Sequence, residues 1–451
     1  MAKNKTVYVC NNCGAESSKW IGRCNSCGQW NTYVEQVVST GPVKQPSYTG
    51  ESVKPRLLND ITASAGERIA SGMKETDRIL GGGIVPGSLV LLGGEPGVGK
   101  STLALQMAMQ LTGKKILYVS GEESAEQIKL RASRMEHENE ACYVYPETSL
   151  EEIINNAEAI KPGLIIIDSI QTISTAALES SAGTISQVRE CAARLLKYAK
   201  QTAVPVLLIG HITKDGSLAG PKILEHIVDV VLQFEGDNNY IYRILRSLKN
   251  RFGATTEIGI FEMLTTGLRE VSNPSEMFVS THDEKLSGVA IAATIDGIRP
   301  FMIETQALVS SAVYGTPQRS STGFDTRRLN MLLAVLEKRA GFRLGIKDVF
   351  MNIAGGLKVS DPAIDMAVIS AVLSSNLDIP VNRNVCFAGE TGLSGEIRAV
   401  SHIDQRIKEA SKLGFSKIFI SSHARLNNNK PGNIDIVKVG KVESLVKKLF
   451  A

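Results

Sequence analysis

Between residues 88 and 210, short apolar runs alternate with segments that have helical periodicity. The apolar runs cover 88–93, 115–120, 164–168 and 205–210, and the helical segments lie near 100–111, 124–134 and 184–200. Uninterrupted apolar runs of this length are typical of strands that are buried on both faces of a sheet. The pattern therefore predicts an α/β domain in which a parallel sheet is covered by helices.

A pair of strands is predicted within 227–248, and the pattern changes from about residue 275. The later segments are paired strands over 288–310, a helix with spaced leucines over 325–340, a strand, loop and helix over 349–375, and a hairpin followed by a helix over 389–415. This mixture indicates an α+β domain. Residues 36–58 carry Pro, Gly, Ser and Thr without periodicity, as linkers do. We therefore expect an N-terminal module in 1–35, a linker in 36–58, the α/β domain in 59–272 and the α+β domain in 273–451.

The composition is that of a folded protein and says little about its chemistry. Of the 451 residues, 43% are hydrophobic and 21% are charged, and the net charge is +4. Such a small charge does not by itself predict nucleic-acid binding. The first residues lack the apolar core of a signal peptide, and no apolar stretch is long enough to span a membrane. We expect a cytoplasmic protein with no membrane partner.

Four of the seven cysteines lie within the first 27 residues. Cys10, Cys13, Cys24 and Cys27 form two Cys-x2-Cys pairs, and four thiolates make a closed tetrahedral zinc site. The segment is too short for a hydrophobic core, so the metal would supply its folding free energy. An iron–sulfur cluster and a redox pair are the alternatives. Nearby, Trp20, Trp30, Lys19 and Arg23 either form a contact surface or cover this knuckle.

The stretch GSLVLLGGEPGVGKST (87–102) joins an apolar run, a glycine-rich loop and the start of a helix. It contains the pattern G-x4-G-K-[ST], in which backbone N–H groups surround the phosphates of a nucleotide. We expect Lys100 to reach the β- and γ-phosphates and the Ser101 hydroxyl to ligate magnesium. The predicted ATP-binding residues of this loop are Gly94, Glu95, Pro96, Gly97, Val98, Gly99, Lys100, Ser101 and Thr102.

Two further apolar runs end in side chains that suit a nucleotide site. Asp168 ends the run GLIIID, and His211 follows the run VPVLLIG. The carboxyl ends of parallel strands meet at the edge where ligands bind in an open α/β sheet. We expect Asp168 to hold magnesium through water. His211 either senses the γ-phosphate or simply caps its strand.

Hydrolysis also needs a carboxylate that orients and activates water, and the run KILYVS is followed by Glu122 and Glu123. Ser120 and Glu123 have the spacing of a capping box, which would give Glu123 a structural role. Ser124 and Gln127 have the same spacing, and a cap there would leave both glutamates free. We favour Glu122 as the catalytic base.

The stretch from Ser71 to Thr102, with its leader DRILGGG, resembles the corresponding segment of RecA-like and DnaB-like ATPases. Together with the four cysteines and the sequence KNRFG at 249–253, the similarity narrows to the bacterial RadA (Sms) family of recombination proteins and spans essentially the whole chain. By this resemblance, Glu122 is the catalytic glutamate of a RecA-like core. The segment 212–222 corresponds to a DNA-contacting loop, in which Lys214 and Lys222 would follow the phosphates.

The resemblance implies a DNA-dependent ATPase motor that processes recombination intermediates. Homohexamers would encircle single-stranded DNA, move along it by hydrolysing ATP, and promote branch migration after a RecA-type recombinase has started strand exchange. The implied cofactors are ATP, Mg²⁺ and Zn²⁺, and the implied partners are single-stranded and branched DNA and the recombinase. Two alternatives are an ATP-dependent protease and a RecA-class signalling ATPase that does not translocate.

The C-terminal third resembles the proteolytic domain of Lon, which cleaves peptides with a Ser–Lys dyad. By this resemblance, Ala363 stands at the position of the nucleophile and Asp404 at the position of the lysine. Alanine has no nucleophilic atom, and aspartate does not act as a neutral amine base. Ser360 lies nearby, but its use would move the oxyanion geometry. We expect a proteolytically inactive domain that holds a ring together.

The sequence KNRFG follows the strand pair predicted at the far side of the ATPase sheet. In RecA-like rings this edge faces the nucleotide of the neighbouring subunit. Lys249 and Arg251 lie two residues apart on backbone that we expect to be extended, so their side chains would point the same way. We favour an interpretation in which both act in trans on the neighbour's triphosphate. A DNA contact and a solvated turn are the alternatives.

Overall fold

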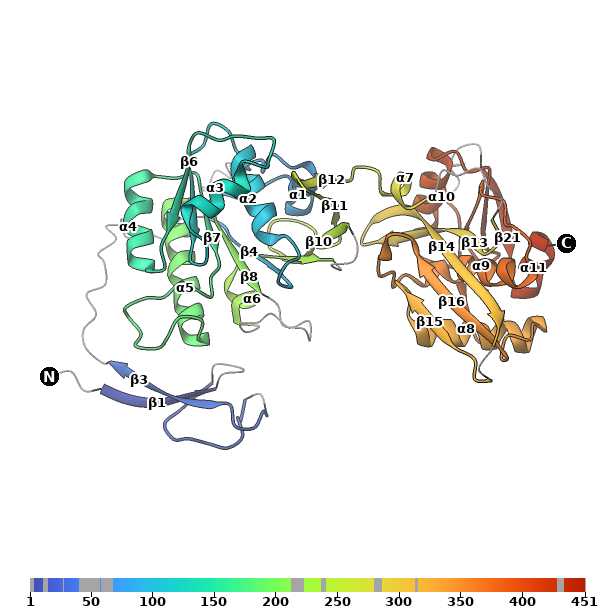
Figure 1. The fold of residues 1–451 in the computed structure, drawn as a ribbon, viewed down its shortest axis with the longest axis horizontal. Helices are drawn as coiled ribbons and strands as arrows, with labels where there is room; N and C mark the ends of the chain where they lie inside the picture. Colours follow the sequence, from blue (N-terminus) through green and yellow to red (C-terminus); the bar gives the residue numbers. More distant parts are fainter. Residues whose placement is uncertain are drawn as a thin grey trace. The chain divides into compact units, whose positions relative to one another are not determined.

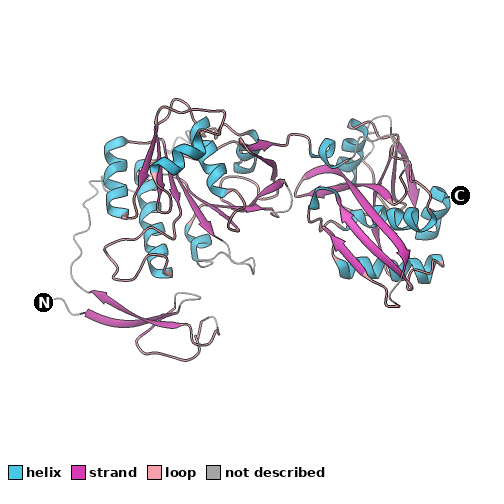
Figure 2. Cartoon of the chain, viewed as in Figure 1, coloured by secondary structure: helices cyan, strands magenta, loops and turns pink. Residues whose placement is uncertain are grey.

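The computed structural model describes residues 4–10, 15–26, 28–39, 57, 68–211, 223–236, 241–279, 286–312, 315–427 and 434–450. The chain divides into two compact units, Met1–Glu270 and Val271–Ala451, close to the boundary expected at residue 272. Figures 1 and 2 show the helices and strands of each unit. Within the described part of the chain, no helix is long and apolar enough to cross a membrane.

The N-terminal module is a three-stranded antiparallel sheet with the order β2-β1-β3. Its strands are β1 (Asn4–Cys10), β2 (Glu16–Ser17) and β3 (Tyr33–Ser39). β1 and β3 pair along their whole length, from Asn4 opposite Ser39 to Cys10 opposite Tyr33. Residues 36–39, which we expected to belong to the linker, therefore continue this sheet, because their backbone groups pair with the first strand.

A nine-stranded sheet with the order β12-β11-β10-β9-β4-β8-β7-β5-β6 follows. Its parallel strands are β4 (Leu89–Gly94), β5 (Ile116–Ser120), β6 (Cys142–Pro146), β7 (Leu164–Asp168), β8 (Val206–His211) and β9 (Val230–Glu235). The helices are α1 (Lys74–Leu80), α2 (Lys100–Gln110), α3 (Ala125–Ala132), α4 (Leu150–Ile160), α5 (Ile185–Thr202) and α6 (Ile223–Ile227). The four apolar runs and three helical segments predicted from the sequence are confirmed, whereas β6, α1, α4 and α6 were not predicted.

Side chains along the parallel strands alternate between two covered faces. Val90 and Leu92 pack in one hydrophobic core with α1, α2 and α3. Leu89 and Leu91 pack in the other core with α4, α5 and α6. In Figure 1 the helices α4 and α5 lie on one side of these strands and α2 and α3 on the other. Because both faces are covered by helices, the central positions of β4, β5, β7 and β8 are apolar, which explains the uninterrupted runs.

Beyond β9 the sheet continues with three antiparallel strands, β10 (Tyr242–Asn250), β11 (Ile258–Leu264) and β12 (Gly267–Glu270). The strand pair predicted within 227–248 corresponds to β9 and β10, but β11 and β12 were not expected. Neighbouring strands with short connections pair antiparallel, because a parallel connection needs a long crossover. The ATPase sheet is therefore mixed rather than parallel throughout.

The second unit is an α+β domain around a seven-stranded mixed sheet with the order β15-β16-β14-β13-β17-β20-β21. The strands are β13 (Val289–Asp296), β14 (Arg299–Ser311), β15 (Arg319–Thr322), β16 (Lys347–Ile353), β17 (Val385–Ala388), β20 (Lys417–Ser421) and β21 (Asp435–Val439), with a small hairpin of β18 (Glu390–Thr391) and β19 (Ile397–Arg398). The helices are α7 (Pro274–Phe278), α8 (Thr326–Ala340), α9 (Asp365–Leu377), α10 (Ile403–Lys412) and α11 (Val442–Phe450), with short 3₁₀ helices at Ala354–Gly356 and Pro362–Ile364. α9 packs on β13 and β14, and α10 contributes to a core with β13, β17 and β20.

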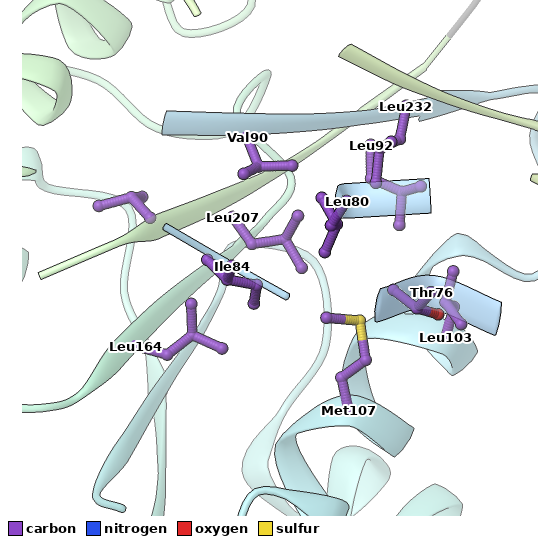
Figure 3. A pocket seen from close by; sticks show the side chains of 11 residues that line it. Thr76, Leu80, Ile84, Val90, Leu92, Leu103, Met107, Leu164, Leu207 and Leu232 are labelled. Atoms are coloured by element: carbon purple, nitrogen blue, oxygen red, sulfur yellow. The ribbon is translucent and has the colours of Figure 1, made fainter. Parts of the chain in front are cut away.

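A small cavity of about 10 Å³ lies in the ATPase core between α1, α2 and the sheet. Figure 3 shows that its lining is apolar apart from the oxygen of Thr76. This hydroxyl is buried and has no hydrogen-bond partner. A buried water needs two or more polar partners, so the cavity is a packing defect of the core and not a ligand site.

Candidate nucleotide-binding and hydrolysis site

The glycine-rich loop connects the buried end of β4 to the first turn of α2, as the sequence predicts. Gly99 has a φ of 108°, a conformation that favours glycine. A Cβ on Gly94 would lie 2.5 Å from the carbonyl oxygen of Phe234, so no larger residue fits there. Open space surrounds the position of a Cβ on Gly97, at the exposed crest of the loop. Ser101 and Thr102 follow in the first turn of α2.

Lys100 is buried at the start of α2. Its ammonium donates hydrogen bonds of 2.9 Å to the carbonyl oxygens of both Gly94 and Glu95. Burial lowers the pKa of Lys100, and the carboxylates of Asp168 and Glu122 partly oppose that shift. The lysine therefore lies within electrostatic reach of both predicted acidic residues, although the three groups come from different elements.

The two candidate glutamates have different partners. Glu122 Oε1 accepts a hydrogen bond of 2.8 Å from the hydroxyl of Ser169, the residue that follows β7. Glu123 forms an ion pair with Arg131 of α3. Glu122 is thus positioned beside the end of β7, whereas Glu123 is held to a neighbouring helix.

The cap of α3 explains how the two glutamates are separated. Ser124 and Gln127 form the capping box, which is the second of the two caps considered from the sequence. Ser120 Oγ accepts a hydrogen bond of 3.0 Å from the backbone N–H of Glu123, which is one half of the other box, but this bond lies in the turn after β5 and not at the start of α3. The Glu123 side chain forms the ion pair with Arg131, so Glu123 has a structural role through both contacts.

Asp168 ends β7 and lies opposite Ser120 of β5 in the strand register. Its Oδ2 accepts a hydrogen bond of 2.7 Å from the hydroxyl of Tyr118. Burial, followed by the charge of Asp168, raises the pKa of Tyr118 well above its usual value, so this tyrosine remains a donor. Asp168, Glu122 and Ser101 offer only oxygen ligands at this edge, and oxygen ligands are what Mg²⁺ prefers. The residues present therefore fit a magnesium–nucleotide complex.

The remaining residues predicted at this edge are only partly described. His211 ends β8, and its backbone lies opposite Gly94 in the register of β4 and β8. Its side chain is outside the described part of the chain, so its role stays a prediction. Lys214 and Lys222 also lie outside the described residues.

The KNRFG sequence lies at the opposite end of the strands, near the amino ends of β4 and β9. We call this end of the sheet the opposite edge. Asn250, the last residue of β10, pairs with Val230, and Val230 pairs with Val90 near the start of β4. Gly94, at the other end of β4, is four residues further along, about 13 Å away at ~3.3 Å per residue. Lys249 and Arg251 are therefore remote from the nucleotide loop of their own chain.

A buried carboxylate organises this opposite edge. Asp229 accepts hydrogen bonds from the Leu89 backbone N–H at 3.1 Å and from the Lys200 ammonium at 2.7 Å. Arg251 Nη1 lies 3.3 Å from the same carboxylate. Lys249 Nζ donates to the carbonyl oxygens of Glu225 and Val228, at 2.6 and 2.8 Å, and so caps the C-terminal end of α6.

The backbone at this pair differs from the expectation in one respect. We expected Lys249 and Arg251 to share one extended strand, but β10 ends at Asn250 and Arg251 lies in the bend that follows. Both side chains nevertheless point towards the segment between α6 and β9. Asn250 causes the bend, because its side chain accepts a hydrogen bond from the Phe252 N–H.

Two of the four cysteines of the N-terminal module, Cys10 and Cys24, are described, and both are buried in one small cluster. The Cys10 N–H bonds to the Ala15 carbonyl and the Cys24 N–H bonds to the Gln29 carbonyl, at 2.9 and 2.8 Å, so each cysteine begins a turn of the same length. Two equivalent turns with buried thiols fit a tetrahedral thiolate site for zinc. Cys13 and Cys27 lie outside the described residues.

Three family models match parts of the chain: AAA domain over 60–217, Rubredoxin metal binding domain over 8–35, and Subunit ChlI of Mg-chelatase over 305–424. Over 448 residues the chain is 46% identical to the DNA repair protein RadA of Bacillus subtilis (strain 168), which covers 98% of each chain. It is also 46% identical to the DNA repair protein RadA of Listeria monocytogenes, over 99% of this chain and 98% of that protein. The chain belongs to the RadA family.

Membership of the RadA family confirms the resemblance on which the sequence analysis relied. The chain is a homologue of DNA repair proteins, with a RecA-like ATPase domain, an N-terminal rubredoxin-like zinc ribbon and a ChlI- or Lon-like C-terminal domain. Among solved structures, a KaiC-like protein of Pyrococcus horikoshii has a TM-score of 0.39 and 24% identity, over 45% of this chain and 98% of that one.

Arg243 supports the nucleotide loop of this RadA-family chain and was missed from the sequence. Its side chain is buried, and its Nε donates a hydrogen bond of 3.1 Å to the carbonyl oxygen of Val98. Because the Val98–Gly99 peptide is planar, fixing this carbonyl also fixes the direction of the Gly99 N–H. The signal available in the sequence was an arginine between apolar residues in the strand YIYRIL.

In the C-terminal domain of this RadA-family chain, the positions that we expected to correspond to the Lon dyad make structural contacts. Ala363 is buried in a 3₁₀ turn, and Asp404 is half-buried and accepts hydrogen bonds from Asn427. The nearby Asp361 instead pairs with Arg406, at 2.6 Å, and Arg406 is buried. Sequence analysis missed this ion pair, which occupies the space beside Ala363.

Proposed function

We propose that this chain is a DNA-stimulated ATPase motor that acts on recombination intermediates and promotes branch migration during DNA repair. The observation that carries the proposal is the convergence of Lys100, Glu122 and Asp168 at one sheet edge, with KNRFG at the other. One edge has the groups needed to cleave a phosphoanhydride bond. The opposite edge has the cations that a neighbouring subunit would use.

Each residue at the nucleotide edge has a distinct role in this proposal. The backbone of residues 94–99 surrounds the phosphates, and Lys100 neutralises charge on the β- and γ-phosphates. Glu122 accepts a proton from the attacking water, and the Ser169 hydroxyl orients the carboxylate. Ser101 and Asp168 would hold magnesium, which supplies further charge neutralisation when it is bound.

We infer that Lys249 and Arg251 act in trans within a homohexamer. Their separation from the loop of their own chain, about 13 Å along the strands at ~3.3 Å per residue, supports a contact with the triphosphate of a neighbouring subunit instead. Lys249 also caps α6, the helix that directly follows the predicted DNA loop 212–222 with Lys214 and Lys222. A change at the neighbour's nucleotide would therefore be transmitted to the DNA loop through one lysine. Single-stranded and branched DNA and a RecA-type recombinase are the proposed partners.

In this proposal each of the three folded parts has its own role. The zinc ribbon contacts a partner, the ATPase domain supplies the motor, and the C-terminal domain holds the ring without proteolysis. The buried pair of Asp361 and Arg406 supports the last point, because the region of the Lon dyad is occupied by structural hydrogen bonds. A casein degradation assay with the full chain is expected to show no cleavage.

The central experiment compares ATP hydrolysis with and without single-stranded DNA. Wild type should be stimulated by DNA, and Lys100→Ala should abolish hydrolysis. Glu122→Gln should lower the rate roughly 10²- to 10⁴-fold. The matched variant Glu123→Gln should stay near the wild-type rate, because that glutamate pairs with Arg131 outside the site. An ATP hydrolysis rate that is the same with and without DNA would refute the proposed motor function.

A mixing experiment tests the action in trans. Arg251→Ala chains have an intact nucleotide loop, and Lys100→Ala chains have an intact KNRFG sequence. If Arg251 acts on the neighbouring subunit, each variant alone is inactive and a mixture regains part of the activity. A mixture that remains inactive, or an Arg251→Ala protein with normal hydrolysis, would contradict this arrangement.

A further inference from the structure

The zinc ribbon has two exposed tryptophans side by side. Trp20 is 56% exposed and Trp30 is 68% exposed. A Cβ placed on Gly22 would lie 3.7 Å from the Trp20 ring and 3.9 Å from the Trp30 ring, so both rings lie beside the same backbone position. Of the two possibilities left open by the sequence, this exposure favours a contact surface. We call the surface formed by the two rings the tryptophan pair.

The tryptophan pair is held by the backbone of the second cysteine turn. Arg23 and Trp30 form a bridge between two short extended segments, and the Asn31 N–H donates to the Gly22 carbonyl at 2.7 Å. The Arg23 side chain donates to the Gly28 carbonyl at 3.0 Å, and its guanidinium lies 5.8 Å from the centre of the Trp30 ring. Ring and cation are therefore positioned before any partner binds.

The surroundings of the tryptophan pair are polar and cationic. Among the ribbon side chains that the structure describes, the two tryptophans are the only large apolar ones that are exposed. Lys19 precedes Trp20 directly in the chain, and the Arg23 guanidinium lies beside the Trp30 ring. A protein-docking patch normally has an apolar centre formed by several side chains. Isolated aromatic rings among cations are instead typical of surfaces that bind single-stranded nucleic acid.

We propose that the tryptophan pair is a stacking site for the bases of single-stranded DNA, with Arg23 and Lys19 contacting the phosphates. Every base has a flat π-face, so this contact is independent of sequence. The inference rests on the proposed action on DNA and adds a second DNA contact, separate from the loop at 212–222. The ribbon would hold the strand by its bases, whereas the motor would track its backbone.

Trp20 and Trp30 are the only tryptophans in the sequence, so the tryptophan fluorescence of the protein reports on this pair alone. Full-length, zinc-loaded protein is titrated with a homothymidine oligonucleotide, and tryptophan fluorescence is recorded together with the anisotropy of a label on the DNA. Stacking should quench the fluorescence in step with binding. Trp20→Leu and Trp30→Leu should each weaken binding roughly fivefold to 100-fold. Trp30→Phe should restore part of the affinity.

Controls separate stacking from misfolding and from loss of the motor. The zinc content of each variant should equal that of wild type, which shows that the ribbon is folded. Tyr143→Leu removes another exposed aromatic side chain, on β6, and should leave DNA binding unchanged. The rate of ATP hydrolysis without DNA should be the same in all these variants, because none of the residues touches the nucleotide site.

Several outcomes would overturn the proposal. Fluorescence that stays constant while anisotropy shows saturated DNA would mean that the tryptophans do not touch it. Unchanged affinity in both leucine variants would have the same meaning. A fluorescence change with purified RecA-type recombinase but not with DNA would make the pair a protein-binding surface. In each of these cases, DNA-stimulated hydrolysis by wild type would still support the proposed motor function. Hydrolysis that DNA does not stimulate would contradict the motor function itself.

Discussion

The buried ion pair of the C-terminal domain gives a prediction whose magnitude follows from the structure. Arg406 is 1% exposed, and its guanidinium bonds to Asp361 Oδ2 at 2.6 Å and to the Ala293 carbonyl at 2.7 Å. Arg406→Met keeps most of the side-chain volume but removes every donor. The carboxylate of Asp361 then loses its counterion, and the carbonyl loses its partner. Breaking one side of a buried pair costs about 3–5 kcal/mol.

The matched control is Arg398→Met in the same domain. Arg398 pairs with Glu396 at 2.7 Å, but its side chain is 58% exposed. Water screens this pair, so its loss should cost about 1 kcal/mol or less. In the double variant Arg406→Met with Asp361→Asn, neither partner is left as an unpaired charge. Its cost should therefore be clearly smaller than the sum of the two single costs.

The assay is native-state hydrogen exchange on amides of α10 and β13 in the full chain. A chain with two units need not unfold in one step, and both tryptophans are in the ribbon, so fluorescence does not report on this domain. Exchange gives the opening free energy of the domain itself. If Arg406→Met costs no more than Arg398→Met, the buried pair beside Ala363 does not stabilise the domain, and the structural role proposed for this region is wrong.

Three further predictions test other parts of the chain. Thr76→Val removes a buried hydroxyl without a partner and should raise the opening free energy of α1 by about 1 kcal/mol in hydrogen exchange; a lower value would contradict the packing defect. Arg243→Gln loses the hydrogen bond to the Val98 carbonyl and should raise the KM for ATP roughly tenfold. Arg246→Gln on the same strand should not, and equal KM values in both variants would count against a loop-positioning role. Cys24→Ser should release zinc, measured by mass spectrometry, while hydrolysis without DNA persists; full metal content would refute the thiolate site.

The elements that the sequence predicted well are those with a local cause. The strands β4, β5, β7 and β8 were found within a residue or two, because burial on both faces leaves a continuous apolar run. The edge strand β6 was missed, because its side chains are partly exposed and Tyr143 points to solvent, so no such run appears. The local pattern of apolar residues thus predicts strands that are buried on both faces, and it does not predict a strand that is partly exposed.

The candidate site shows the same division. The loop from Gly94 to Thr102 and the strand-ending Asp168 follow from local spacing, which is why their places are as predicted. The different roles of Glu122 and Glu123 do not follow from local spacing. They depend on Ser169, which is far away in the sequence, and on Arg131 of the following helix. Two adjacent glutamates look equivalent until their partners are known.

By itself, the sequence determined the order of the domains, the main strands and helices, the phosphate-binding loop and the two cysteine turns, because each depends on neighbours within a few residues. Only the tertiary structure decided which strands pair. That pairing places KNRFG and the nucleotide loop of the same chain at opposite ends of the strands. The tertiary structure also decided that Arg243 reaches Val98 and that Arg406 reaches Asp361. These contacts join residues 45 or more positions apart, and a pairing over such a distance is fixed by the packing of the whole domain rather than by any local pattern.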